Sequence, residues 1–161
     1  MSKRVRHDLV YDAPASEVLA MLHDTSFREE VCDATGVLRH DVSVTETDGR
    51  TDVRIEQVQT AQGIPSFAQK FVGDEIEIVQ VERWTDDTHA DVEVTIPGKP
   101  GHMRGTATLV ESGGTTTEQV DLEIKVNIPL VGGKIEGLIA DLLAKALRAE
   151  HRTGVTWLAG S

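Results

Sequence analysis

The sequence predicts an α+β fold in which a curved seven-stranded antiparallel sheet is combined with two short helices and one long C-terminal helix. Three observations lead to this prediction. Apolar residues recur with a period of two through most of residues 37–128, as in strands that bury one face. A helical repeat of apolar residues then runs from Gly133 to about Leu158. Two shorter helical patterns lie between residues 13 and 36.

The N-terminal segment is expected to form one strand and then two short helices. Apolar and polar residues alternate over residues 5–11, which predicts the strand. A helix is predicted over residues 13–22. It has a proline near its first turn, where proline is favoured because the backbone N–H groups there have no hydrogen-bond partner within the helix. Ser26 and Glu29 stand at capping-box spacing at the start of the second helix, which Gly36 is placed to end.

The strands that follow are expected to form an antiparallel meander, because the segments between them are hairpin-sized. Turn-forming residues lie at 47–49, 85–87, 97–101 and 112–114. The apolar alternation shifts by one residue at 55–58 and again at 76–81. Such shifts predict β-bulges, which bend a sheet.

Residues 62–73 interrupt the period of two, and we expect a loop with a helical turn between the third and fourth strands of the chain. Phe67 and Phe71 lie in this segment, although only 4% of the residues in the chain are aromatic. Two interpretations are open. The segment is either a lid over the mouth of a cavity or a plug that completes the core.

The C-terminal helix has one broad apolar arc and an opposite charged face. Its apolar arc contains Ile135, Leu138, Ile139, Leu142, Leu143, Ala146, Leu147, Ala149 and Trp157. A helix over residues 133–158 is about 39 Å long at 1.5 Å per residue, enough to cross a whole curved sheet. The arc is therefore expected to lie against the concave side of that sheet.

Glu150 also falls within this arc, which is unexpected for a charged residue. A buried carboxylate is costly unless it is paired. We favour the interpretation that Glu150 extends past the end of the sheet into solvent. The alternative is a partner in the interior, for which Arg83, Arg104 and His40 are the candidates.

Length and charge predict a single acidic domain over residues 1–161, and a cytoplasmic location is expected because residues 1–10 show no continuous apolar run typical of a signal peptide. The net charge is -11, from 27 acidic against 16 basic residues, so neither nucleic acid nor an anionic membrane surface is an expected partner. No apolar run approaches the ~18 residues that suggest a membrane span, and no stable membrane insertion is expected. Cys32 is the only cysteine, which excludes a disulfide within the chain. The oligomeric state is left open.

No motif indicates catalysis, a metal or a cofactor. The six histidines form no close ligand pair such as H-E-x-x-H, so no metal site is expected. No nucleophile signature such as G-x-S-x-G occurs. Gly132, Gly133 and Lys134 precede the long helix, but their spacing fits no phosphate-binding loop and predicts a structural turn. We therefore expect no cofactor and assign no catalytic residue.

A resemblance to a known superfamily adds to this interpretation. The residues that carry it are Ala13, Pro14, Val18, Asp24, Phe27 and the junction Ile128, Pro129, Leu130, Val131, Gly132, Gly133, Lys134, Ile135 and Glu136. With the predicted order of elements, they resemble the helix-grip fold of the START-like superfamily, which includes lipid-transfer domains, polyketide cyclases and aromatases, and plant-type ligand carriers. Within it, the chain is most similar to an uncharacterised actinobacterial family of unknown function. The resemblance implies a cavity for apolar molecules between the sheet and the long helix.

Residues expected to face or close this cavity form the candidate ligand-binding site. They are His40, Val42, Ile55, Phe67, Phe71, Ile76, Val94, Met103, Ala107, Leu122, Ile124, Ile139, Leu143, Leu147 and Glu150. His40 has the parity of Val42 and Val44, which points its ring towards the concave face. It is interpreted either as a buried histidine bonded to backbone or water, or as a ligand contact.

Three functions follow from this prediction. The sequence favours the non-enzymatic binding or transport of a hydrophobic or amphipathic small molecule, such as a lipid, sterol or polyketide. An alternative is a polyketide cyclase- or dehydratase-like enzyme in which His40 and Glu150 are the acid–base groups. A further alternative is a protein-interaction module without a cavity.

Overall fold

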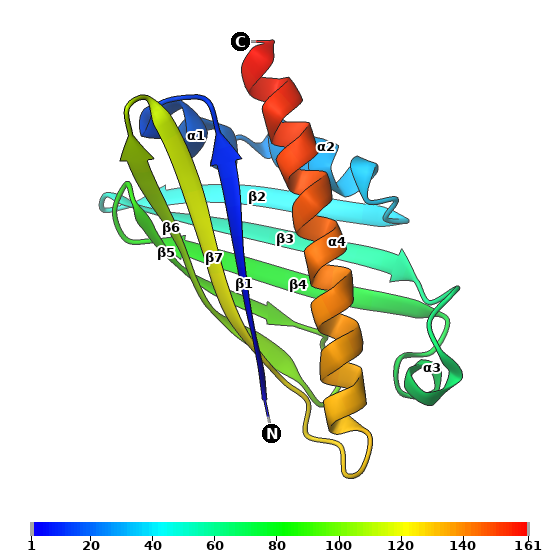
Figure 1. Cartoon of the computed structure of the whole chain (residues 1–161). Helices are drawn as coiled ribbons and strands as arrows, with labels where there is room; N and C mark the ends of the chain where they lie inside the picture. The colour runs from blue at the N-terminus through cyan, green and yellow to red at the C-terminus, as the bar shows by residue number, and fades with distance from the viewer. Residues whose placement is uncertain (1, 161) are drawn as a thin grey trace.

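The computed structural model describes residues 2–160 and confirms the predicted fold class. A seven-stranded antiparallel sheet curves around one long helix, with two short helices at one end and a third beside the other end (Figure 1). The elements are β1 (Lys3–Tyr11), α1 (Ala15–Leu22), α2 (Thr25–Ala34), β2 (Arg39–Thr47), β3 (Arg50–Thr60), α3 (Ser66–Val72), β4 (Glu75–Trp84), β5 (His89–Thr95), β6 (His102–Ser112), β7 (Thr115–Lys125) and α4 (Gly132–Ala159).

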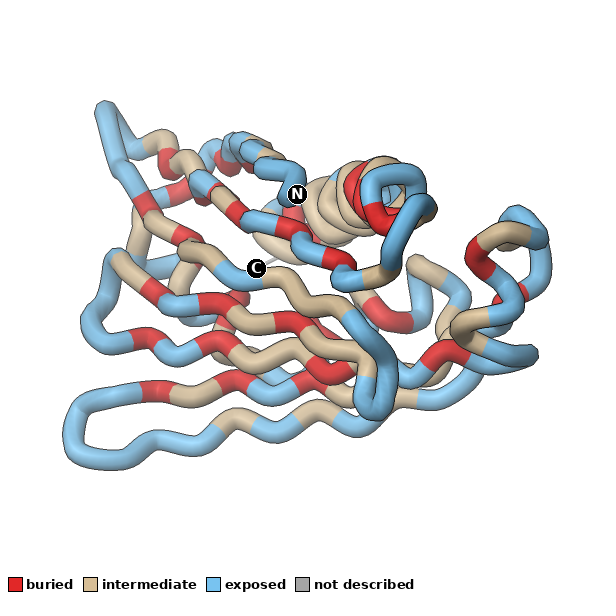
Figure 2. Tube along the Cα trace, turned by 90° about the horizontal axis from the view of Figure 1, so that it is seen from below, coloured by how far each residue is buried: buried red, intermediate tan, exposed pale blue. Residues whose placement is uncertain are grey.

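The strand order in the sheet is β1-β7-β6-β5-β4-β3-β2. Strands β2 to β7 pair in chain order as a meander, and β1 joins the last strand, β7. Buried and exposed positions alternate along the strands, as expected for a sheet with one buried face (Figure 2). Helix α4 packs against β1, β7, α1 and α2, so it crosses the concave face close to the β1 edge.

The prediction of β-bulges was wrong. Strand β3 keeps one unbroken register with β2 and with β4. The shift in the apolar pattern arises because Val58, Val79 and Val81 lie on the convex face, where Val79 pairs with Glu56 and Thr95. Val79 is only 7% exposed even on this outer face. Apolar residues on the outer face therefore produce the same sequence pattern as a bulge.

The start of α2 also differs from the prediction. Its N-cap is Asp24, whose carboxylate accepts a hydrogen bond from the Ser26 backbone N–H at 2.8 Å. A capping box built on Ser26 and Glu29 is therefore not used, because the helix begins one residue before Ser26. Gly36, with φ of +73°, follows the helix end as expected.

The segment over residues 62–73 contains more helix than predicted. Helix α3 spans seven residues and lies beside the start of α4. Ala68 is buried there, and Phe67 and Phe71 are half-buried in a small apolar cluster with Ile135 and Ile139 of α4. This cluster is separate from the main core, which lies under α1, α2 and the second half of α4.

The junction before α4 is tight and partly polar. A Cβ atom on Gly132 would lie 2.6 Å from the carbonyl oxygen of Val126, so the close approach requires glycine at this position. Buried Glu136 accepts a hydrogen bond from the Val126 backbone N–H at 2.9 Å. These contacts fix the first turn of α4 to the end of β7.

Gly154 provides a test of how α4 packs on β1. A Cβ atom at this position would lie 2.7 Å from Cε1 and 3.0 Å from the hydroxyl of Tyr11, which is fully buried. We expect Gly154→Ala to lower the free energy of unfolding by about 1–3 kcal/mol, although alanine favours helix. Urea unfolding followed by circular dichroism measures this change.

Gly137→Ala is the matched control for this substitution. Nothing lies within 4 Å of a Cβ atom at Gly137, so this variant is expected to be more stable by up to about 1 kcal/mol. Equal stabilisation by the two substitutions would contradict the packing of Gly154 on Tyr11.

Candidate ligand cavity and buried charged cluster

An apolar cavity lies at the end of the molecule where α4 begins. Its volume is about 70 Å³. The wall combines residues of α3 and the start of α4 with residues of β5, β6, the β5–β6 connection and the β7–α4 connection. Apolar side chains form most of this wall, so the cavity suits an apolar group.

Four of the predicted ligand-binding residues line this cavity: Phe71, Val94, Met103 and Ile139. The other apolar residues of that set lie elsewhere on the concave side. They are buried in the core (Ile55, Ile76, Ala107, Leu122 and Ile124) or half-buried against it (Val42, Phe67, Leu143 and Leu147). A ligand-binding role stays a prediction for all of these residues, including the four that line the cavity.

Sequence reasoning missed much of the cavity wall. The missed residues are Ala68, Val72, Ile96, Lys99, Pro100, Gly101, His102, Val126, Ile128 and Ile135. Several belong to connections that the sequence marks only as turns. Strand parity shows which face a side chain occupies, but it does not show which loops fold over the end of the sheet.

His40 lies on the concave side of the edge strand β2, as its parity predicted, but its partner was not foreseen. Its Nε2 atom is 3.3 Å from Oδ1 of Asp33 in α2. The side chain is 23% exposed. His40 therefore contacts an acidic residue of α2 rather than the backbone.

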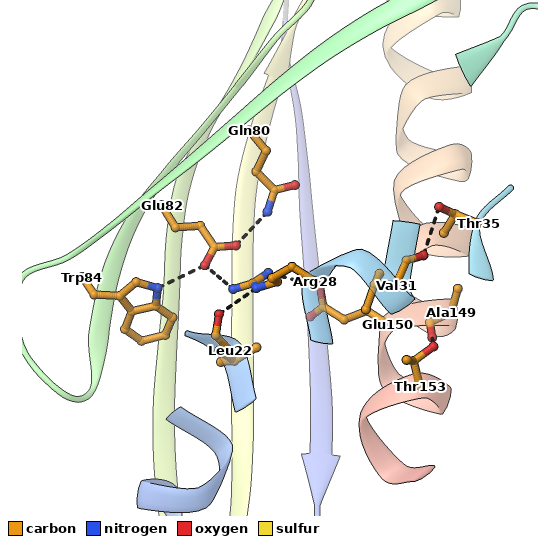
Figure 3. A network of polar contacts seen from close by, with 10 residues as sticks. All are labelled: Leu22, Arg28, Val31, Thr35, Gln80, Glu82, Trp84, Ala149, Glu150 and Thr153. Carbon is orange, nitrogen blue, oxygen red and sulfur yellow. Dashed lines mark hydrogen bonds and ion pairs between the residues drawn. The ribbon is translucent and has the colours of Figure 1, made fainter. Parts of the chain in front are cut away.

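A second polar feature lies deep under α2, where Arg28 forms the centre of a buried network (Figure 3). Its Nη2 atom donates to Oε1 of Glu82 at 2.6 Å, and its Nε donates to the carbonyl oxygen of Leu22 at 2.7 Å. Glu82 also accepts from the Trp84 indole at 3.0 Å and from the Gln80 amide at 2.7 Å. Arg28 and Glu82 are 2% and 5% exposed, so this ion pair is almost fully removed from water.

Two further carboxyl groups face the same guanidinium. Oε1 of Glu150 lies 3.7 Å from Nη1 of Arg28, and buried Glu118 of β7 is close enough to Glu150 for the two carboxyl groups to influence each other's pKa. Burial raises the pKa of Glu118 well above its usual value, and the neighbouring Glu150 and Glu82 raise it further. Burial also raises the pKa of Glu150, against the opposing effect of Arg28.

The favoured interpretation of Glu150 was therefore wrong. Its side chain is only 12% exposed and its partners are Arg28 and Glu118, neither of which was among the candidates. The sequence did contain a signal for this cluster, because Glu82 and Glu118 occupy buried strand parities. Two carboxylates on the buried face require a buried cation or a proton.

His40 and Glu150 contact different residues. His40 pairs with Asp33, and Glu150 pairs with Arg28 and Glu118. The structure therefore does not unite them as the acid–base pair of the enzymatic alternative.

Among residues 2–160, no helix is both long enough and apolar enough to cross a lipid bilayer. Within the same range, no group of three or more His, Cys, Asp or Glu side chains is arranged to hold a metal ion.

A curved sheet wrapped around a long C-terminal helix is the START-like fold. The START superfamily protein of Mycobacterium smegmatis has this architecture, with a TM-score of 0.59, 18% identity, and coverage of 93% of this chain and 96% of that one. The Zhui aromatase/cyclase of Streptomyces sp. R1128 is also similar, with a TM-score of 0.66, 13% identity, and coverage of 97% and 93%. These likenesses show the fold.

The chain belongs to the family described as protein of unknown function (DUF2505), whose model matches residues 6–158. The uncharacterized protein Rv0481c of Mycobacterium tuberculosis is 27% identical over 118 residues, which cover 69% of this chain and 67% of that protein. The resemblance drawn from the sequence is thereby confirmed.

Proposed function

We propose that the protein binds a hydrophobic or amphipathic small molecule between α4 and the concave face of the sheet, without chemical conversion. The apolar cavity at the start of α4 carries this proposal. Its only ionisable lining residues are Lys99 and His102, within the described part of the chain. The START-like fold supports the binding part of the proposal, because the similar solved structures include a START superfamily protein and an aromatase/cyclase.

The size of the cavity implies that its wall moves when a ligand enters. Ligand pockets usually measure about 300–1,000 Å³, several times the 70 Å³ of this cavity. Helix α3 is the element that would move. It lies between Gly63 and Gly73, which have φ of +88° and +77° and open space around them. Hinges of this kind allow a lid to open while the sheet stays rigid.

Ala68→Leu tests the proposal by filling the cavity. Ala68 is 4% exposed and lines the cavity from α3, so three added carbon atoms take the place of a ligand group. With a fluorescent fatty acid as the probe, we expect the affinity to fall by about tenfold or more, equivalent to about 1.4 kcal/mol. A fluorescence titration of both proteins measures this loss.

Ala20→Leu on the exposed side of α1 is the control and should leave the affinity unchanged. Native mass spectrometry of the purified protein adds an independent readout. Failure to bind fatty-acid, sterol and polyketide probes alike, with no co-purified apolar molecule, would refute the proposed function.

A further inference from the structure

The connection between β7 and α4 exposes a large apolar side chain in a strained conformation. Leu130 is 102% exposed, the largest value among the exposed large apolar residues of the described chain. Its φ is +73°, in the left-handed region that residues other than glycine rarely adopt. Strained backbone conformations of this kind cluster at functional sites, so the exposed Leu130 side chain is a candidate for a binding contact.

The segments around Leu130 have a charge opposite to that of the whole chain. Residues 62–73, 96–103 and 124–135 contain four lysines and no aspartate or glutamate. The four are Lys70, Lys99, Lys125 and Lys134, and all are exposed. The rest of the chain therefore contains all 27 acidic residues. At physiological salt, charges more than about 8 Å apart are largely screened. Exposed Asp74 and Glu123 adjoin these segments, and the four lysines outnumber them, so the local charge is positive.

Contacts among these segments place the four lysines at one end of the molecule. Lys125 is the register partner of His102, which adjoins the connection that holds Lys99. The Lys134 ammonium lies 5.7 Å from the centre of the Phe67 ring, and that of Lys70 lies 5.2 Å from the Phe71 ring. Figure 1 shows this lower end with the β7–α4 connection and α3, and Figure 2 looks at it from below.

We propose that this end, formed by residues 62–73, 96–103 and 124–135, is a docking surface for an anionic lipid membrane. Leu130 would enter the boundary between headgroups and acyl chains, and the four lysines would contact lipid phosphates. The apolar cavity is lined mainly by the same three segments, so docking brings it against the bilayer. The surface is peripheral and needs no spanning segment. It goes beyond the proposed function, because docking does not depend on which molecule the cavity holds.

Vesicle co-sedimentation tests the docking surface without any cavity ligand. We expect the full chain to bind vesicles of equal parts phosphatidylglycerol and phosphatidylcholine. Its affinity for pure phosphatidylcholine vesicles should be at least about tenfold lower, because each lysine near an anionic surface raises the affinity about fivefold. Leu130→Ser should weaken binding to the anionic vesicles by about tenfold. The double substitution Lys99→Gln, Lys125→Gln should weaken it by about 25-fold.

Matched controls change the opposite end of α4. Val155→Ser replaces another exposed apolar residue, and Arg148→Gln, Arg152→Gln removes the same amount of charge. Both controls should bind anionic vesicles as the unchanged protein does. The proposal is overturned if the unchanged protein does not sediment with anionic vesicles. That result is expected if the surface binds an acidic protein instead of a membrane. It is also overturned if the control variants lose as much binding as the Leu130 and lysine variants.

Discussion

Arg28→Met is expected to lower the free energy of unfolding by about 3–5 kcal/mol, because it leaves buried carboxyl groups without their cation. Glu82 would lose its 2.6 Å ion pair and Glu150 its 3.7 Å contact, while both stay largely removed from water. The Leu22 carbonyl oxygen would also lose its hydrogen bond from Arg28. Urea unfolding followed by tryptophan fluorescence measures the change, and Trp84 lies in the network as a local reporter.

Two further variants make this prediction specific. Arg39→Met removes an ion pair with Glu75 in which both side chains are exposed, and it should leave stability unchanged. Arg28→Lys keeps the charge but loses the forked donors, so its stability should lie between that of the unchanged protein and that of Arg28→Met. If Arg28→Met does not fold, Arg28→Lys still provides a measurable value. Equal stability of Arg28→Lys, Arg39→Met and the unchanged protein would show that the buried network contributes little.

Glu118→Gln is expected to make the protein more stable than the unchanged chain at pH 8, with the difference disappearing near pH 4. The pKa of Glu118 is raised in the folded state, so the carboxyl group stays protonated there after it ionises in the unfolded chain. The stability that protonated Glu118 contributes is therefore fully present below the pKa of this carboxyl group in the unfolded chain. It is lost as the pH rises towards the pKa of the group in the folded protein. The loss approaches about 1.4 kcal/mol for each pH unit in that window. Glutamine is neutral at every pH and has nearly the same size and shape as glutamate.

Urea unfolding at several pH values between 4 and 8 measures this effect. Glu30→Gln is the control, because Glu30 is exposed on α2 and its change should have no comparable pH dependence. A stability difference between Glu118→Gln and the unchanged protein that stays constant with pH would mean that Glu118 is ionised in the folded state.

The sequence by itself determined the order of the elements and the class of fold. Local periodicity is sufficient for this, because a period of two requires strands with one buried face and the repeat after Gly133 requires a helix. The predicted helix end at about Leu158 lies one residue from the observed end at Ala159. The same reasoning failed for the bulges, because strand parity does not separate a bulge from valines on the convex face.

Only the tertiary structure decided what the interior contains. Glu82 and Glu118 lie on strands that do not pair with each other, and the curvature of the sheet, together with Arg28 on α2, brings them into one cluster. The cavity wall likewise comes from connections and from α3, which gather at the start of α4. Periodicity shows which face a residue occupies, but volume and charge pairing depend on distances between segments far apart in the chain. These distances are set when the sheet curves and the helices close over it.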